Sequence, residues 1–322
     1  MKGFFNMSTV LTDRTLSYMN INQKFADKEA LLNYINGVFS CGADYVEINS
    51  GLLELLDGED LSEKYILQIC SVKDIKLCVD HKFAYVSIPA DLSVFFDKLS
   101  VFQNIIAEVQ SDKYSIISEL LDHKEHDHFR NVSMIRLTGL LSSDEADMKA
   151  LLGWCRFNFH QPIDICPLNT MLSGSSDALD AFNCGADAVS LSFGRNHYYT
   201  SFEDFLINRQ IMRRSVMTPE SIAALCNASL AFMKLFCTIP SGMERLAIKD
   251  GPTPSPVYDI EKGLAFRPFK PGRRKLPDNE NIIERQIRTI GLEREIEDAI
   301  IDMLKKTNYS FYQNIIKRNF ID

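Results

Sequence analysis

Short apolar runs alternate with segments of helical spacing along roughly the first 210 residues, and this alternation constrains the fold more than any other feature of the chain. Runs typical of buried strands are expected at 7–13, 44–48, 65–70, 84–89, 114–121, 132–140, 162–166 and 187–193. Helical segments are expected at 27–42, 72–82, 92–110, 142–159, 176–185 and 201–212. Strands that are separated by helices in this way form parallel sheets with right-handed crossovers.

Eight such units predict an α/β fold of the (β/α)8 or TIM-barrel type, which typically takes about 250 residues. A doubly wound open sheet is the alternative. No Gly-x-Gly-x-x-Gly follows the first expected strand, so a dinucleotide-binding version of the open sheet lacks support.

After a further helical segment at 218–236, the alternation of strands and helices ends and the proline content rises. Residues 238–281 hold seven of the eleven prolines, which is typical of an extended arm with frequent turns. Residues 281–307 have the spacing of amphipathic helices. We therefore expect a TIM-barrel domain over 1–236 and a C-terminal arm and helical region over 237–322. The large apolar side chains of this region are expected to be buried in dimerisation.

Composition limits the partners and the compartment. The formal net charge is −8, which argues against nucleic acid and membrane as partners. The basic run at 270–275 is interpreted as a solvated loop. The eight cysteines form no Cys-x-x-Cys pair and lie mostly in apolar contexts, as reduced thiols do in a cytoplasmic protein. Neither a signal peptide nor a membrane-spanning run is recognisable.

Polar side chains gather at the expected carboxyl ends of the strands, where TIM barrels hold their active sites. These candidates are Asp13, Thr15, Glu47, Asn49, Ser50, Arg136, Thr138, Cys166, Asn169, Thr170, Ser192 and Arg195. Any one of them is explained as well by the ordinary polarity of loops. Glu47 is the best single candidate, because a carboxylate at the end of 44–48 can face the barrel mouth and act as an acid or base.

A second polar cluster, "DHKEHDH" at 122–128, holds three of the six histidines. Imidazole and carboxylate groups suit zinc or a similar ion. The stretch is highly charged and has no rigid element to support it. A solvated loop is therefore preferred over a metal site.

Three segments, in order along the chain, carry a resemblance to a known superfamily. They are "LTDRTLSY" (11–18), "GADYVEINSG" (42–51) and "DICPLNTMLSGSSDALDAFNCGADAVSLSF" (164–193). They resemble the DRE-TIM barrels that condense or cleave acyl-CoA compounds: homocitrate, isopropylmalate and citramalate synthases and HMG-CoA lyase. The first segment of that superfamily usually reads D-x-T-L-R-[DE]-G. The resemblance implies a TIM barrel and metal-dependent carbon–carbon bond chemistry.

The departures from the superfamily pattern fall on the residues that carry this chemistry. Its polarising Arg and adjacent metal-binding acid correspond to Ser17 and Tyr18. Its two metal-ligating His correspond to Cys166 and Leu168. The acid after the sixth strand corresponds to Arg136, whereas the following residues keep their family identity: Asn169, Gly194, Arg195 and Asn196. The resemblance therefore implies a barrel with no tightly bound metal and no other cofactor.

Two functions remain open. The first is an enzyme that acts on a keto acid or acyl thioester by altered, metal-independent chemistry, or a protein that binds such a ligand. Glu47 would be its acid or base and Cys166 a nucleophile, although a packed thiol is the preferred interpretation of Cys166. The ligand-binding residues would be Asp13, Thr15, Asn49, Arg136, Thr138, Asn169 and Arg195. The second is a non-catalytic pseudoenzyme that forms a homodimer or pairs with an active paralogue.

Overall fold

The computed structural model describes the barrel almost completely and parts of the C-terminal region. The described residues are 9–18, 27–169, 174–194, 199–211, four short helical stretches at 224–225, 227–228, 231–232 and 235–236, and two strands at 256–259 and 264–268. The basic run at 270–275 and the expected helices at 281–307 lie outside the described residues, as does Arg195.

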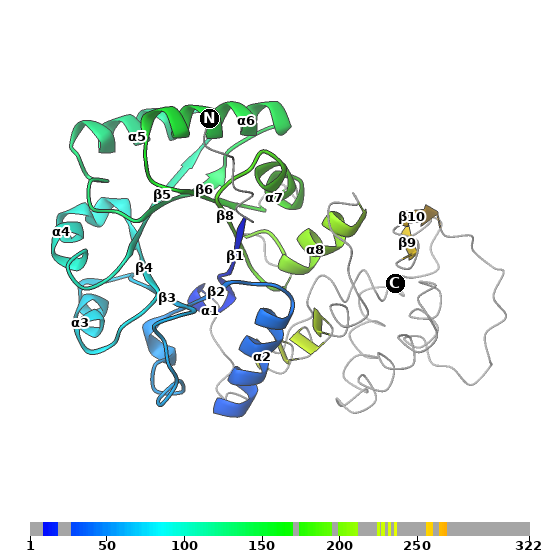
Figure 1. Cartoon of the computed structure of the whole chain (residues 1–322), viewed down its shortest axis with the longest axis horizontal. Helices are drawn as coiled ribbons and strands as arrows, with labels where there is room; N and C mark the ends of the chain where they lie inside the picture. Colours follow the sequence, from blue (N-terminus) through cyan, green and yellow to red (C-terminus); the bar gives the residue numbers. More distant parts are fainter. Residues whose placement is uncertain are drawn as a thin grey trace, which may run out of the picture.

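Eight parallel strands close into one barrel in the order in which they occur along the chain (Figure 1). They are β1 (Val10–Asp13), β2 (Tyr45–Ile48), β3 (Tyr65–Gln68), β4 (Tyr85–Pro89), β5 (Ile105–Asp112), β6 (Met134–Leu140), β7 (Ile163–Pro167) and β8 (Ala188–Leu191). The barrel closes where β1 pairs with β8, through partners such as Leu11 and Val189. The predicted TIM-barrel fold is therefore confirmed.

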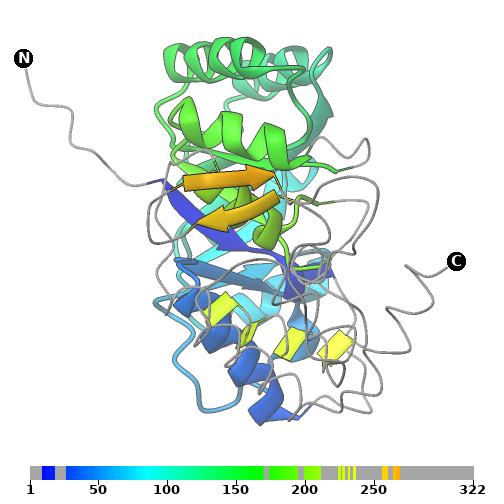
Figure 2. The same ribbon diagram turned by 90° about the vertical axis from the view of Figure 1, so that its right-hand side faces the viewer.

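Helices surround the barrel (Figure 1). They are α1 (Thr15–Tyr18), α2 (Lys28–Ser40), α3 (Val72–Asp80), α4 (Phe96–Leu99), α5 (Ile116–Glu125), α6 (Glu145–Asn158), α7 (Gly174–Asn183) and α8 (Phe202–Ile211), with the 3-10 helices η1 (Ser50–Leu52) and η2 (Ala90–Phe95). In the C-terminal region β9 (Pro256–Asp259) and β10 (Leu264–Pro268) form an antiparallel pair (Figure 2). No helix of the described residues is long and apolar enough to cross a membrane.

The fifth unit differs from the prediction. Residues 92–110, expected as one long helix, contain most of η2, all of α4 and most of β5, and residues 114–121, expected as a strand, belong largely to α5. A short apolar run such as Ile105–Val109 has no decisive period, and only its pairing between β4 and β6 settles its structure. Gln103 lies between α4 and β5, and its side-chain amide links this segment to the end of α3 by donating to the carbonyl oxygens of Cys78 and His81.

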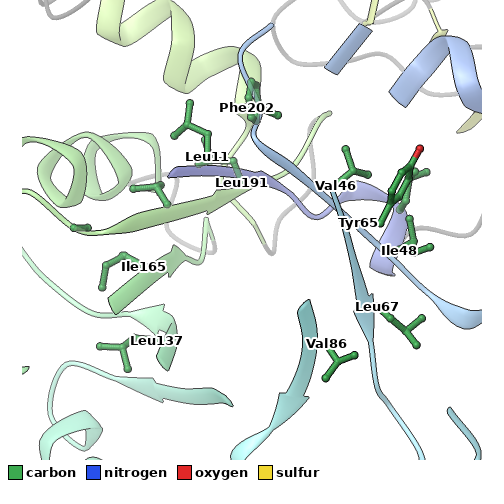
Figure 3. Close-up of a cluster of buried hydrophobic side chains, with 14 of the residues drawn as sticks. Leu11, Val46, Ile48, Tyr65, Leu67, Val86, Leu137, Ile165, Leu191 and Phe202 are labelled. Carbon is green, nitrogen blue, oxygen red and sulfur yellow. The ribbon is translucent and has the colours of Figure 1, made fainter. Parts of the chain in front are cut away.

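Each strand presents two different faces. Outward residues such as Val46, Leu137 and Ile165 belong to the main hydrophobic core between strands and helices (Figure 3). Alternate positions form a separate apolar cluster near the amino ends of the strands: Ile66, Ile106, Met134 and Ala188 with Val10, Tyr45 and Tyr85. Above this layer the inward positions become polar, although the interior of a TIM barrel is usually filled by branched aliphatic residues. This polar layer is where the barrel departs from a purely hydrophobic interior.

The revised position of β5 leads to a test at Gly139, which pairs with Ser111 across the β5–β6 ladder. A Cβ at Gly139 would overlap the carbonyl oxygen of Ser111, so Gly139→Ala should lower the free energy of unfolding by about 1–3 kcal/mol or more. Gly153 lies on the exposed face of α6 with nothing near its missing Cβ, so Gly153→Ala should raise it by up to about 1 kcal/mol. Urea denaturation measures both changes. Equal unfolding midpoints for the two variants would contradict the β5–β6 pairing.

Candidate functional site

Arg14 follows β1 directly and extends its fully buried guanidinium into the barrel interior. Its Nε donates to Glu47 Oε1 at 3.0 Å, while Nη1 and Nη2 donate to Glu108 Oε1 and Oε2 at 3.0 and 2.8 Å. The second pair of bonds is the two-pronged arrangement that gives guanidinium–carboxylate pairs their strength and fixed geometry. Arg14 thus connects the end of β1 to β2 and β5.

Arg136 on β6 extends the same network. Its Nε donates to Asp164 Oδ2 at 2.6 Å, and its Nη1 donates to Glu47 Oε2. Thr138 donates to Glu108, and Ser190 on β8 donates to Asp164. We call the five charged residues the central network: Arg14, Glu47, Glu108, Arg136 and Asp164. Their side chains are 0–1% exposed except that of Glu108, which is 14% exposed.

Opposite charges within the central network shift the pKa values of Arg14 and Glu108 toward their ionised forms. Burial alone would lower the pKa of Arg14, but the carboxylates of Glu108 and Glu47 raise that pKa well above its usual value. Burial would likewise raise the pKa of Glu108, but the charges of Arg14 and Arg136 hold it below its usual value. Among the described residues, Arg136 Nη2 and Asp164 Oδ1 lack hydrogen-bond partners. The network is therefore more completely bonded around Arg14 than around Arg136.

Cys166 lies at the end of β7, where its Sγ accepts a hydrogen bond from Arg14 Nη1 at 3.2 Å. Burial raises the pKa of this thiol to about 11, and the nearby charge of Arg14 only partly opposes the effect. A thiol with this pKa is protonated at neutral pH, and the thiolate is the nucleophilic form. The environment of Cys166 is thus that of a packed thiol.

Asp13 and Thr15 lie in a separate buried cluster. Asp13 accepts hydrogen bonds from the Thr15 hydroxyl at 2.6 Å and from Tyr34 of α2 at 2.9 Å. Thr15 Oγ1 in turn accepts one from the backbone N–H of Phe193 at 2.6 Å. Burial raises the pKa of Asp13 to about 6. These contacts tie the end of β1 to α2 and to the segment after β8.

Two further predicted ligand-binding residues, Asn49 and Asn169, also make local contacts outside the central network. Asn49 caps η1 by accepting from the N–H of Gly51, and Asn169 accepts from the N–H of Gly174. The structure therefore brings together Glu47, Arg136, Thr138 and Cys166, but places Asp13, Thr15, Asn49 and Asn169 in local capping and packing contacts.

Sequence reasoning missed three members of the central network. Arg14 lies between the predicted residues Asp13 and Thr15 and is not itself predicted, although it continues the inward alternation of β1. Glu108 was hidden because its segment was expected to be helical. Asp164 lies in the middle of β7, where no strand-end argument selects it. Alternation along correctly placed strands is the signal that would have found all three.

The ring of Tyr199 lies over Arg14. The Cζ of Arg14 lies 5.1 Å from the ring centroid of Tyr199, within the range of a cation–π contact. The rings of Tyr199 and Tyr18 are 4.6 Å apart. Tyr18 corresponds to the metal-binding acid of the resemblance, so a ring stands where that pattern has a carboxylate.

The side chains in the barrel do not fit the divalent ion that the resemblance implies. The corresponding positions offer a phenol at Tyr18, a protonated thiol at Cys166 and no donor at Leu168, and the guanidinium of Arg14 is hydrogen-bonded to Cys166. No group of three His, Cys, Asp or Glu side chains in the described part of the chain could hold a metal. The expectation of a metal-free mouth stays a prediction.

The histidine cluster is more ordered than a solvated loop. His123 lies in the last turn of α5 rather than in a loop, and its Nδ1 is 2.9 Å from Nδ1 of His128. Chiefly because of burial, the pKa of His123 is below its usual value. The pair joins the end of α5 to the turn that follows it.

Glu203 is a buried carboxylate near the start of α8. It accepts hydrogen bonds from the N–H of Gly194 and from the hydroxyl of Ser201. Gly194 has a φ of 87°, and a Cβ there would overlap the ring of Phe232. Glu203 therefore fixes a turn that only glycine fits. Burial raises the pKa of Glu203 to about 8.

A first prediction concerns Glu47, whose two oxygens are bonded to Arg14 and Arg136. Glu47→Gln should lower the free energy of unfolding by about 3–5 kcal/mol, because it leaves buried positive charge without its counter-charge. Glu54→Gln, on an exposed turn, should change it by no more than about 0.5 kcal/mol. Denaturant unfolding of both variants gives the comparison. A loss at Glu47 as small as at Glu54 would show that the network contributes little.

A second prediction concerns pH. The folded-state pKa of Glu203, about 8, lies above its ordinary value of 4.5. Folding therefore favours the protonated form, and the stability it contributes is lost as pH rises through about 8. Asp13, whose pKa is raised from 3.8 to about 6, likewise loses its contribution to stability as pH rises to about 6. The melting temperature should fall between about pH 4.5 and about pH 8, and Glu203→Gln should reduce that fall. An unchanged pH dependence in Glu203→Gln would exclude Glu203 as the titrating group.

Comparisons of sequence and structure with known proteins give different results. Neither a protein-family model nor a curated protein matches this sequence. Solved structures do match the fold. An HMG-CoA lyase from Acinetobacter baumannii, solved with coenzyme A and 3-methylmalate, is 12% identical, with a TM-score of 0.61 over 78% of this chain and 98% of that chain. The HMG-CoA lyase of Bacillus subtilis is 12% identical, with a TM-score of 0.56 over 71% and 94%.

The carboxyl transferase domain of Rhizobium etli pyruvate carboxylase, solved with pyruvate and biocytin, also matches. It is 13% identical, with a TM-score of 0.55, and the match covers 73% of this chain and 49% of that chain. At these identities the likeness shows the fold. The resemblance inferred from three sequence segments is thus confirmed at the level of architecture: this chain has the barrel fold of the HMG-CoA lyases and of the pyruvate carboxylase carboxyl transferase domain.

Proposed function

We propose that this protein is a barrel of the homocitrate synthase and HMG-CoA lyase type that lacks the metal-dependent condensing site and acts as a non-catalytic binding or partner subunit. The engagement of most of the N–H groups of Arg14 by the protein's own acceptors carries the proposal. Four hydrogen bonds, to Glu47, Glu108 and Cys166, engage four of its five N–H groups.

A guanidinium that polarises a substrate must have N–H groups directed at the substrate oxygen. Those of Arg14 are directed at buried carboxylates. A substrate oxygen could take the remaining N–H of Nη2, but to gain a second bond it would have to displace one of these acceptors, and breaking a buried ion pair costs about 3–5 kcal/mol. The arrangement therefore favours a structural role for Arg14 over an electrophilic one.

The two predicted catalytic groups are engaged in the same way. Both oxygens of Glu47 accept from guanidinium groups, so neither is left to take a proton from a substrate. The thiol of Cys166 is protonated at neutral pH because burial raises its pKa to about 11. General base and nucleophile are thus both held in unreactive states.

One observation favours the alternative of metal-independent chemistry on a keto acid or acyl thioester, or binding of such a ligand. Glu108 is the partly exposed member of the central network, and it holds two of the N–H groups of Arg14. A carboxylate ligand that displaced Glu108 would gain the same two-pronged contact. In this second candidate Thr138, which donates to Glu108, would contact the ligand as well.

In this proposal the protein is cytoplasmic, and residues 237–322 provide the pairing surface. It would form a homodimer or a complex with an active paralogue. Support comes from the sequence, in the proline-rich arm and the amphipathic spacing of 281–307. The barrel core itself extends to Leu235, which is buried with Phe232, so pairing would use the chain beyond it.

An activity assay separates the candidates. Untagged protein should form no acetoacetate from HMG-CoA and release no thiol from acetyl-CoA mixed with 2-oxoglutarate or 2-oxoisovalerate, with or without added Mg²⁺, Mn²⁺ or Zn²⁺. Elemental analysis should find well under one metal per chain. An HMG-CoA lyase assayed in parallel controls for the reagents. Turnover that disappears in Glu108→Gln would instead establish the second candidate, and a stoichiometric metal with turnover would contradict both.

A further inference from the structure

The α5 helix ends in a turn whose backbone follows the Schellman pattern. The N–H of Asp127 donates to the carbonyl oxygen of Lys124 at 3.1 Å, and the N–H of His128 donates to that of His123 at 3.0 Å. Asp127 has a φ of 54°, in the left-handed region that glycine usually occupies at this position. Because residues other than glycine rarely adopt this conformation, the turn depends on the contacts that hold its two ends together.

The two residues joined by the outer hydrogen bond of a Schellman turn usually make an apolar side-chain contact. In this turn both are histidines. Nδ1 of His123 lies 2.9 Å from Nδ1 of His128, and the ring centroids are 5.2 Å apart. The ring of His123 also packs on buried Phe129, with centroids 5.3 Å apart. A titratable pair thus takes the place of the apolar contact that ordinarily closes such a turn.

We propose that the His123–His128 pair is a pH-sensitive switch, which closes the turn between α5 and β6 at neutral pH and opens it when both imidazoles are protonated. A hydrogen bond between two Nδ1 atoms needs one ring as donor and the other as acceptor. Two neutral rings of different tautomers satisfy this requirement, and so does one imidazolium with one neutral imidazole. Two imidazolium rings do not, because both Nδ1 atoms then carry protons and both rings are positive. The inference does not depend on the proposed function.

The charges around the pair allow one added proton more readily than two. The charged groups are Glu119, Asp122 and Lys124 of α5, Asp91 of η2, and Asp127 and Arg130 of the turn. Burial, the largest effect, and the charge of His128 lower the pKa of His123 below its ordinary value of 6.5, although Asp122, Asp91 and Glu119 oppose this. The doubly protonated pair therefore forms only in solution more acidic than that value.

A third histidine adds to the effect of acid. The ring of His126 stacks on that of His128, with centroids 5.4 Å apart, and its Nδ1 lies 2.8 Å from the carbonyl oxygen of Asp122. A helix carboxyl end favours one nearby positive charge. Three imidazolium rings within one turn repel one another, so acidification weakens the turn beyond the loss of one hydrogen bond.

Opening of the turn would uncover the apolar ring beneath it. Phe129 packs on Phe159 with centroids 5.7 Å apart, and its carbonyl oxygen accepts from Gln161 Nε2 at 2.7 Å. These contacts lie outside the barrel strands. Acidification is therefore expected to expose an apolar surface at this end of α5 while the barrel itself stays folded.

Hydrogen–deuterium exchange of the full-length protein tests the switch. A local measurement is needed, because the titrations of Glu203 and Asp13 change global stability in the opposite direction. Protection of the backbone N–H groups of 126–128, corrected for intrinsic exchange, should fall about tenfold or more between about pH 7.5 and about pH 5. Protection of the barrel strands should not fall with it.

Matched variants identify the titrating pair. His128→Phe replaces the pair by the usual apolar contact and should abolish the pH dependence of protection at 126–128. His81→Asn removes an exposed histidine after α3 and should leave that dependence as in the wild type. Equal protection of the wild type at both pH values would overturn the proposal, as would a fall that persists in His128→Phe. If His128→Phe does not fold, His123→Leu makes the same test from the helix side.

Nitrogen NMR of wild-type protein labelled in its histidines tests the hydrogen bond directly. At about pH 7.5, one of the two Nδ1 atoms should carry a proton and the other should not, and at about pH 5 both should be protonated. Two Nδ1 atoms that both lack a proton at neutral pH would exclude the hydrogen bond and overturn the proposal.

Discussion

Two buried guanidinium groups hold the middle of this barrel, and the arrangement of its strands depends on how their charge is balanced. Arg14 and Arg136 share Glu47, and each has a further carboxylate, Glu108 or Asp164. Removing a charge from water costs several kcal/mol, which only good geometry and further hydrogen bonds offset. The network therefore fixes which strands face one another more than it adds net stability, because any other register would leave an ion unpaired.

Apolar groups enclose the polar layer. Below it lies the cluster of Ile66, Ile106, Met134 and Ala188, and the outer faces of the same strands pack on the helices. Above it the ring of Tyr199 lies over Arg14. Low polarity on these sides strengthens each ion pair within the layer. The same enclosure raises the pKa of Cys166 and so removes its reactivity.

The sequence alone predicts the fold class and the positions of seven of the eight barrel strands, because the alternation of apolar runs with helical segments is a local property of the chain. The fifth strand was misplaced, since Ile105–Val109 reads equally well in either state until its neighbours are known. The residues of the site are harder to predict, because their pairing also depends on parts of the chain that are distant in sequence. Arg14 and Glu108 are 94 residues apart, and no local pattern indicates that they pair. Asp13 and Asn49, predicted as ligand-binding residues at strand ends, are instead hydrogen-bonded to nearby side chains and backbone groups.

Because the members of the central network share partners, they cannot change independently over evolutionary time. Glu47 contacts both guanidinium groups, so a substitution there alters the requirement at Arg14 and at Arg136 together. Substitutions at such sites are strongly non-additive. A lineage could leave this arrangement only through paired or compensated replacements, passing through intermediates of low stability. Once acquired, the salt-bridged residues at the barrel centre would therefore be retained, while the surface and the loops diverge.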